Sequence, residues 1–483
     1  MAAALWAIAL AAAASDARAF ALGPVETDGP ADSKIRLEIY DRVRGEFVDW
    51  FNPKPGNPQP IYRYNFFANK FQLGVRIKRD PVEAFAQLQH SLLDDLPGAA
   101  QGPGGLYFAN THDTFQEQAF LRQGWARLKG ASFAPGLALL GGRFLYRDGT
   151  EVVPKDRALA WIVNTRVAER LIGPFDYTNI GRSFDGGTAA WDDDLWNAAA
   201  FYLRPDTGGY EINAGHAIAQ INVAGASASL KPSEAFPGSL ARLFAIYYAD
   251  SRNVVWVDNR PLEDRKADHD SSLIWTLGTD FMHVEPIGPG QADVLLWGLG
   301  QFGHWQSLDH RAWAFAAEGG YQLPDVPWQP WMRVGFDMGS GDDDPNDGLH
   351  TTFFQILPTA RIYAQFPFYN MMDNQDAFAQ ILLWPAKEWH VRSDVHVLRV
   401  SDEQDLLYSG GGANKGDAFG FSGLPANGNR DVGVLLDLAV SWKPRDFFTL
   451  YAYYGHVFGD GVISANYEGK SANYGYLEGT ISF

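Results

Sequence analysis

The sequence has no cysteine among its 483 residues. A disulfide-stapled scaffold and a thiolate metal centre are therefore excluded. Basic residues are in the minority, with 39 Lys and Arg against 57 Asp and Glu and a formal net charge of −18. This balance argues against a general nucleic-acid binder. Aromatic residues make up 14% of the chain, and apolar residues 46%, which is too much for a disordered protein.

Long apolar runs are also missing, because no stretch approaches the ~18 consecutive apolar residues of a membrane-spanning helix. The N-terminus carries a shorter run over residues 2–14, followed by Ala17-Arg18-Ala19, which matches a small-x-small cleavage site. We therefore expect a signal peptide over residues 1–19 and a mature domain over residues 20–483. An exported chain of this kind is either soluble or a barrel in the outer membrane.

The dominant hydrophobic period is two. Between residues 432 and 442, every second residue is apolar, whereas Asp437 and Ser441 lie on the other face. This pattern predicts a strand with one face in an apolar medium and one in water. Aromatic residues near predicted strand ends are typical of the girdles of membrane barrels. Those residues are Trp50, Trp125, Trp331, Trp389, Trp442 and Tyr454.

About eighteen strands are expected, an even number as in bacterial barrels. Their predicted starts lie near residues 34, 61, 82, 114, 135, 175, 194, 215, 240, 271, 291, 311, 328, 376, 388, 431, 447 and 473. Short links, such as residues 79–81, alternate with long ones, such as residues 339–374, as in outer-membrane barrels. Residues 155–172 have helical spacing and are interpreted as a helical excursion between two strands. The chain ends in Phe483, and a last strand that closes on an aromatic residue resembles the assembly signal of such barrels.

Several stretches resemble the alginate export family. The resemblance is most specific between Trp161 and Tyr408. It is carried by Gly142-Arg143-Phe144, by residues 181–186, 339–348 and 353–359, by Arg361-Ile362-Tyr363 and by Phe368-Tyr369-Asn370. The family implies an all-β fold, a monomeric transmembrane antiparallel barrel of eighteen strands with long extracellular loops and short periplasmic turns. It also implies conduction of an anionic uronate polysaccharide through a lumen that arginines constrict and loops close.

Arginine suits such a conduit because its planar fork pairs with a carboxylate through two hydrogen bonds. An arginine that faces lipid at the bilayer midplane costs ~2–4 kcal/mol, so mid-strand arginines are expected to point inward. The predicted substrate-conducting residues are Arg76, Arg122, Arg333 and Arg392 by strand phase, and Arg143, Arg182 and Arg361 by the resemblance. The alternative is that these arginines only pair with lumen carboxylates such as Glu38, Asp337, Asp394 and Asp437.

One acidic loop has the spacing of a calcium site. Asp342, Asp344 and Asn346 occupy the first, third and fifth positions of such a loop. The sixth position is Asp347 instead of Gly and the twelfth is Phe353 instead of Glu, so the EF-hand pattern fails. A solvated or lid-like loop is the favoured interpretation, and no metal or cofactor is expected.

Other chemistry is not indicated. His390 and His396 share a strand face but are predicted to lie ~20 Å apart, too far to share a metal. The sequence contains no Gly-x-Ser-x-Gly, no HExxH and no phosphate-binding loop, so we do not expect an enzyme.

The favoured function is an anion-selective outer-membrane channel that exports alginate or a related polyuronate by passive diffusion. The expected partners are the polysaccharide, outer-membrane lipid, the barrel assembly machinery and a periplasmic secretion scaffold. A monomer that binds no nucleic acid is expected. The alternatives are an uptake porin for small anionic solutes or oligosaccharides, an outer-membrane hydrolase and a soluble secreted lectin. The sequence does not identify the polymer or its direction of travel.

Overall fold

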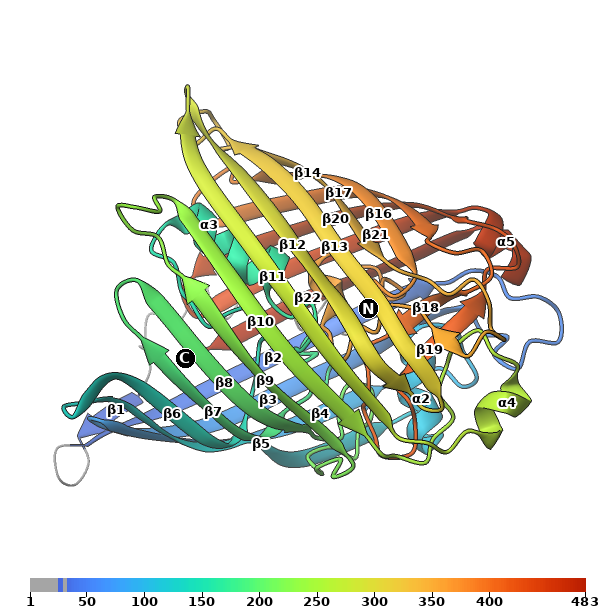
Figure 1. The fold of residues 1–483 in the computed structure, drawn as a ribbon, viewed down its shortest axis with the longest axis horizontal. Helices are drawn as coiled ribbons and strands as arrows, with labels where there is room; N and C mark the ends of the chain where they lie inside the picture. Colours follow the sequence, from blue (N-terminus) through green and yellow to red (C-terminus); the bar gives the residue numbers. More distant parts are fainter. Residues whose placement is uncertain (1–24, 29–32) are drawn as a thin grey trace.

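Eighteen antiparallel strands form one closed barrel in the computed structural model of the chain, which describes residues 25–28 and 33–483 (Figure 1). The predicted signal peptide lies outside these residues. The wall strands are β2 (Lys34–Asp49), β3 (Arg63–Arg79), β4 (Val82–Asp94), β5 (Gln116–Ala131), β6 (Ala134–Phe144), β7 (Phe184–Asp192), β8 (Trp196–Pro205), β9 (Ile221–Leu230), β10 (Ser239–Asp250), β11 (Ser272–Ile287), β12 (Gly290–Trp305), β13 (Leu308–Gln322), β14 (Trp331–Gly339), β16 (Asn374–Leu383), β17 (Trp389–Val400), β20 (Asp431–Arg445), β21 (Phe448–Gly459) and β22 (Ser471–Ser482).

The barrel closes because β2 pairs with β3 on one side and with β22 on the other, where Tyr40 faces Ser482. The short strand β1 (Val25–Asp28) pairs with β2 beyond the end of β22. The all-β prediction and the eighteen strands are confirmed, and sixteen strands begin within three residues of the predicted position. The sixth and eighth begin later, at Phe184 and Ile221, because the residues before them belong to loops.

Link lengths differ between the two ends of the barrel. Residues 80–81, 132–133 and 446–447 make two-residue turns at one end. The opposite end carries most of the long links, together with helices α2 (Pro103–Thr111), α4 (Leu262–Ala267) and α5 (Gly461–Asn466) and the small sheet of β18 (Leu406–Gly410) and β19 (Phe421–Pro425). Figure 1 shows α4 and α5 together at this end. The predicted alternation of short turns and long loops is therefore confirmed.

Two long links fold into the barrel interior. The first inner segment, residues 145–183, contains helix α3 (Arg157–Ile162) and the π-helical turn η2 (Val163–Val167), so the predicted helical excursion is confirmed but is shorter. The second inner segment, residues 351–373, follows the two-residue strand β15 (Leu349–His350) and contains the 3-10 turn η3 (Ala360–Ile362). Backbone hydrogen bonds such as Gly173 N to Leu357 O join the two segments. Their apolar residues, including Leu159 and Phe354, are buried and form part of the core.

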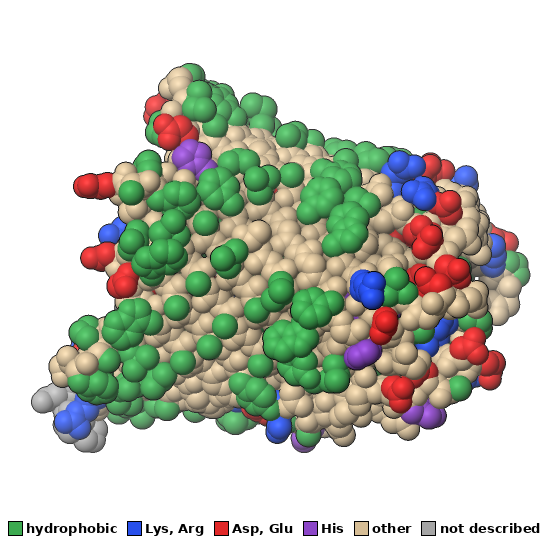
Figure 2. Space-filling model, viewed as in Figure 1, with side chains coloured by type: hydrophobic (Ala, Val, Ile, Leu, Met, Phe, Trp, Pro, Cys, Tyr) green, Lys and Arg blue, Asp and Glu red, His purple; other side chains and the backbone are tan. Residues whose placement is uncertain are grey.

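On the face seen in Figure 2, the middle of the wall carries apolar side chains, and charged side chains lie toward the two ends, most of them at the long-loop end. On β20, Leu436 and Leu438 are 39% and 45% exposed, whereas Leu435 and Asp437 are buried, as the period of two predicts. None of the described helices is long and apolar enough to span a membrane.

The girdle prediction is partly wrong. Trp389 and Tyr454 are exposed, but Trp50 and Trp331 are buried inside and Trp125 lies with inward-facing Arg76. Strand phase, and not nearness to a strand end, decides which way a ring points.

Candidate functional site

Arg76 lies on the inward face of β3, near the two-residue turn to β4. Its guanidinium reaches Glu38 at 2.7 Å and Glu83 at 2.5 Å and stacks over the ring of Phe85. Its side chain remains 29% exposed to the interior. The inward aim follows the prediction, but the two carboxylates already balance the charge of Arg76.

Arg122 holds the first inner segment against the wall. It is completely buried and reaches Asp176 at 3.0 Å, beside Lys70 at 2.9 Å. Arg42 donates to the carbonyl of the same aspartate at 3.1 Å. Burial alone would raise the pKa of Asp176, but these cations outweigh it and lower the pKa to about 2. Asp176 therefore stays ionised and is the shared acid of Arg122 and Lys70.

Arg333 belongs to a second fully buried cluster, centred on Glu318 of β13. Arg166 and Arg170 from the first inner segment each bond to Glu318 at 2.7 Å, and Arg333 lies at 3.3 Å. Arg333 also pairs with Asp293. The cluster fastens the inner segment to the opposite wall, and Arg333 has no charge left for a passing anion.

Arg182 is buried in the first inner segment and donates to backbone carbonyls, including that of Leu357 at 3.0 Å and that of Gly411. Burial lowers its pKa to about 10. It joins three loops, and its position inside the loop core separates it from any open path.

Arg143 departs from the prediction of an inward aim. It pairs in register with Gly124 on β5 and Asp185 on β7, in phase with Leu139, which is 40% exposed on the outer face. Arg143 is near the end of β6, where its guanidinium reaches Asp185 at 2.7 Å and donates to the carbonyls of Leu121 on β5 and of Gly215. Arg143 therefore lies in the wall and does not line the interior, because its phase is that of the outward set.

Within the described residues, Arg361, like Arg182, forms no ion pair, but unlike Arg182 it lines a cavity. Among residues 25–28 and 33–483, no carboxylate lies within the 4.0 Å of an ion pair with it. Its Nε donates to the carbonyl of Gln365 at 2.7 Å, and its guanidinium lies over the rings of Tyr177 and Tyr474 at 4.3 and 5.1 Å. The residue is 6% exposed and carries an uncompensated charge.

This charge borders a cavity of about 260 Å³ between η2, η3 and the wall. The volume is near the ~300 Å³ lower end of small-molecule sites. Arg392, the fourth residue of β17, also lines it and pairs with Asp394 at 2.6 Å. The cavity is lined by Asn164, Thr165, Tyr177, Thr359, Arg361, Ile362, Gln365, Arg392 and Tyr476. We call it the Arg361 cavity.

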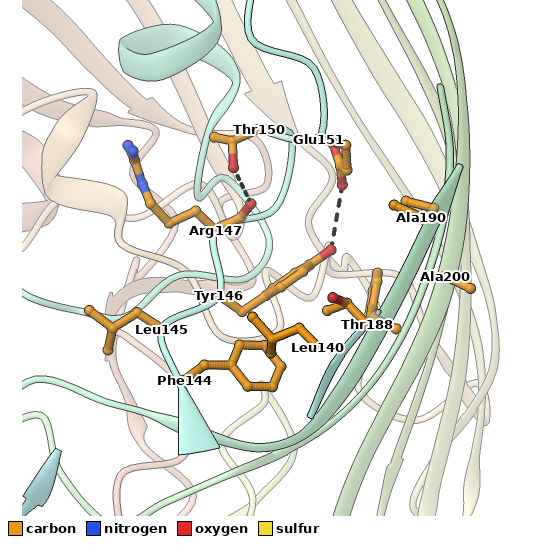
Figure 3. Close-up of a pocket in the computed structure, with 12 residues that line it drawn as sticks. Leu140, Phe144, Leu145, Tyr146, Arg147, Thr150, Glu151, Thr188, Ala190 and Ala200 are labelled. Carbon is orange, nitrogen blue, oxygen red and sulfur yellow. Dashed lines mark hydrogen bonds between the residues drawn. The ribbon is translucent and has the colours of Figure 1, made fainter. Parts of the chain in front are cut away.

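A second cavity, of about 290 Å³, lies between β6–β8 and residues 144–151 (Figure 3). Its wall is mostly apolar, with Phe144, Ala190 and Phe201 among its residues. Arg147 points its guanidinium away from Glu151, and it pairs with Glu169 at 2.5 Å. This cavity offers no free cation to an anionic ligand.

The acidic loop uses its side chains on its own backbone. The carboxylate of Asp342 accepts from Asp344 N at 3.2 Å, and that of Asp344 accepts from Asn346 N at 2.9 Å. Asp342 is buried, and burial raises its pKa to about 6. These contacts agree with the interpretation as a lid-like loop.

Sequence reasoning missed the tyrosines and Gln365 of the Arg361 cavity. The signal that could have found Tyr476 is its phase on the last strand, which it shares with Glu478 opposite Leu477. Tyr177 and Gln365 lie in the inner segments, where no period of two applies. Whether any of the seven arginines contacts a substrate stays a prediction.

A family model described as alginate export matches residues 80–474. No curated protein sequence matches the chain significantly. The solved structure of OccK9 (OpdG) from Pseudomonas aeruginosa is similar, with a TM-score of 0.58 at 9% identity over 92% of this chain and 98% of that chain. A BenF-like porin from Pseudomonas fluorescens Pf-5 gives 0.57 at 9% identity, over 93% and 98%. OccK2 (OpdF) from Pseudomonas aeruginosa, in complex with glucuronate, gives 0.55 at 8% identity over the same shares. At these identities the likeness shows the barrel fold alone.

Proposed function

The chain belongs to the alginate export family, and from this premise we propose that it conducts a uronate polysaccharide through the barrel interior. The family and the porin-like fold support an outer-membrane channel, of the porin type and not of an enzyme type. In such barrels the long loops are extracellular and the short turns periplasmic. We propose passive export of alginate or a related polymer through this protein as a monomer.

The observation that carries the proposal is the free charge of Arg361. Most interior arginines are neutralised by acids, so they attract an anion weakly. Within the part of the chain that the structure describes, no acid pairs with Arg361, and unlike Arg182 it lines a cavity, so its guanidinium can donate to the carboxylate of one sugar unit. The carboxylate that pairs with Arg392, Asp394, keeps the local excess of positive charge small. A weakly binding site of this kind permits entry and release, which conduction requires.

Planar-bilayer recordings test this proposal. The folded barrel should show a reversal potential that favours anions, and uronate oligomers should block its current. Arg361→Gln should reduce both effects. Arg204→Gln is the matched control, because Arg204 shares the outward phase of Tyr202 and bonds to Asn222 at 3.0 Å. Cation preference without oligomer block, or equal effects of the two substitutions, would contradict the proposal.

Uptake of small anionic solutes is the second candidate. It is favoured by the two inner segments, which fold into the interior and line the small Arg361 cavity of about 260 Å³, and by the glucuronate complex of the similar barrel OccK2. Block that rises steeply with oligomer length favours the polymer. Flux of free glucuronate into liposomes, with no block by oligomers, favours the solute.

Two partner predictions belong to the same proposal. The last strand, β22, ends next to Phe483, and we propose that this end is read by the barrel assembly machinery. A periplasmic secretion scaffold would dock at the short-turn end. Loss of assembly on Phe483→Ser, measured as barrel in the outer-membrane fraction, would support the first.

A further inference from the structure

Three buried side chains meet on the inner wall next to the Arg361 cavity. Asp394 and His396 lie two residues apart on β17, and Asp437 is the register partner of Asp394 on β20. Each brings one candidate ligand atom to within 4.8 Å of the other two. All three residues are at most 3% exposed. We call this set the His396 cluster.

The tautomer of His396 is set by a fourth residue. Nδ1 lies 2.9 Å from the carboxylate of Asp376 on β16, and the Tyr369 hydroxyl donates to the same carboxylate at 2.9 Å. A donor at Nδ1 leaves the lone pair of a neutral imidazole on Nε2. That nitrogen is buried and has no hydrogen-bond partner among the described residues. Asp376 is on one neighbouring strand and Asp437 on the other, so Nε2 is the nitrogen available to the cluster.

Of the two cluster carboxylates, and within the described residues, Asp394 has an unsatisfied oxygen and Asp437 has only neutral donors. One oxygen of Asp394 accepts from Arg392 at 2.6 Å, while Oδ1 is buried without a partner. Asp437 accepts from the Gln365 backbone N–H at 2.8 Å and from the Tyr453 hydroxyl, both neutral donors. Asp376, Asp394 and Asp437 thus place three acids around one guanidinium. This excess of buried negative charge is costly unless a further cation balances it.

A protonated His396 imidazole is poorly suited to balance this negative charge. The second proton would be on Nε2, which has no hydrogen-bond partner in residues 25–28 and 33–483. A divalent metal ion instead uses the Nε2 lone pair and the free oxygen of Asp394 together. An imidazole held by a carboxylate through its other nitrogen is the usual outer-shell arrangement of a histidine ligand.

We infer that Asp394, His396 and Asp437 bind one divalent transition-metal cation of the zinc class. An imidazole with two carboxylates suits Zn²⁺ and its first-row neighbours, whereas Ca²⁺ and Mg²⁺ take oxygen ligands. Three protein ligands leave one position of a tetrahedral ion for water. The inference does not depend on what the channel conducts.

The site also touches the Arg361 cavity. Asp394 is shared with Arg392, and Gln365, whose carbonyl accepts from Arg361, donates to Asp437. A bound cation would therefore hold Asp394, which positions Arg392. Through Asp437 it would also hold Gln365, which positions Arg361.

Metal retention tests the inference. The full folded barrel in detergent is stripped with a chelator, incubated with Zn²⁺ or with Ca²⁺, desalted and measured by inductively coupled plasma mass spectrometry. We expect one Zn²⁺ per chain and no retained Ca²⁺. His396→Gln and Asp437→Asn should each lose the zinc, and Asp376→Asn should weaken its binding about 10–100-fold.

His390→Gln is the matched control. His390 lies on the same face of β17, and its Nε2 is also buried without a partner, but among the described residues it belongs to no group of three candidate metal ligands. This variant should retain the full zinc content, and heat-modifiable mobility on a gel should verify that each variant is folded. X-ray absorption of the wild type should show one imidazole and only nitrogen or oxygen ligands. A folded wild type without stoichiometric zinc, or equal loss in His390→Gln and His396→Gln, overturns the inference.

Discussion

Replacement of Glu318 by Gln should release the first inner segment from the wall. One oxygen of Glu318 accepts from Arg166 Nη2 at 2.9 Å and from Arg170 at 2.7 Å, and the other from Arg166 Nε at 2.7 Å and Arg333 at 3.3 Å. Gln keeps one oxygen and turns its amide N–H groups toward the arginines that bonded to the other. Two of the four contacts are lost whichever way the amide points.

The structure sets the size of this effect. A hydrogen bond to a charged group contributes ~1.5–3 kcal/mol, so two lost contacts amount to ~3–6 kcal/mol. Breaking a buried ion pair costs ~3–5 kcal/mol by an independent measure. We therefore expect Glu318→Gln to lower the free energy of unfolding by ~3–5 kcal/mol, since three buried arginines lose their common acid.

Two assays follow this change. Urea unfolding of the barrel in detergent micelles gives the free energy, and single-channel recording gives the conductance, which should rise because α3 and η2 no longer hold their place. Glu263→Gln is the control, since Glu263 is 84% exposed and pairs only with Lys266, a contact of ~0.3–0.5 kcal/mol. A Glu318→Gln barrel with the stability and conductance of the wild type would refute the role of this cluster.

Two further predictions concern the lipid face and the long loops. Leu277→Arg on β11 should lower the free energy of unfolding by ~2–4 kcal/mol in lipid vesicles, because Leu277 faces lipid. Leu262→Arg in α4 should change it by less than ~0.5 kcal/mol, although the two leucines are 49% and 47% exposed. Equal effects of the two substitutions would contradict the assignment of Leu277 to the lipid face. Burial raises the pKa of Asp405, which binds the Asp342 backbone N–H, to about 7. Between about pH 4 and 7 the Asp405 carboxyl is therefore protonated in the folded loop but ionised in the unfolded loop. The stability of the folded loop falls as the pH rises through this window. Proteolysis of residues 411–420 should be faster at pH 8 than at pH 5, and Asp405→Asn should flatten that dependence; a rate that is independent of pH in the wild type would exclude it.

Strand phase carried most of what could be predicted for the wall. It gave the correct faces for Leu436, Asp437, Arg76 and Arg392, because a period of two depends only on the chain itself. It failed for Arg143, where neighbouring leucines occupy both phases and the sequence does not say which one faces lipid. The inner segments follow no such period, so the surroundings of Arg182 and Arg361 could not be read from it.

The sequence by itself determined the barrel, its strand number, the alternation of short and long links, the helical excursion and the family. These features follow from local periodicity, turn composition and motif content. Only the tertiary structure decided which charges are free. Arg122 pairs with Asp176, 54 positions away in the sequence, and Arg166 pairs with Glu318, 152 positions away. No acid of the described chain pairs with Arg361. His396 lies close to Asp437, which is on a strand that follows a long link. Electrostatic pairing depends on a few ångströms between groups that are remote in sequence, and strand phase fixes the side of the wall but not the partner.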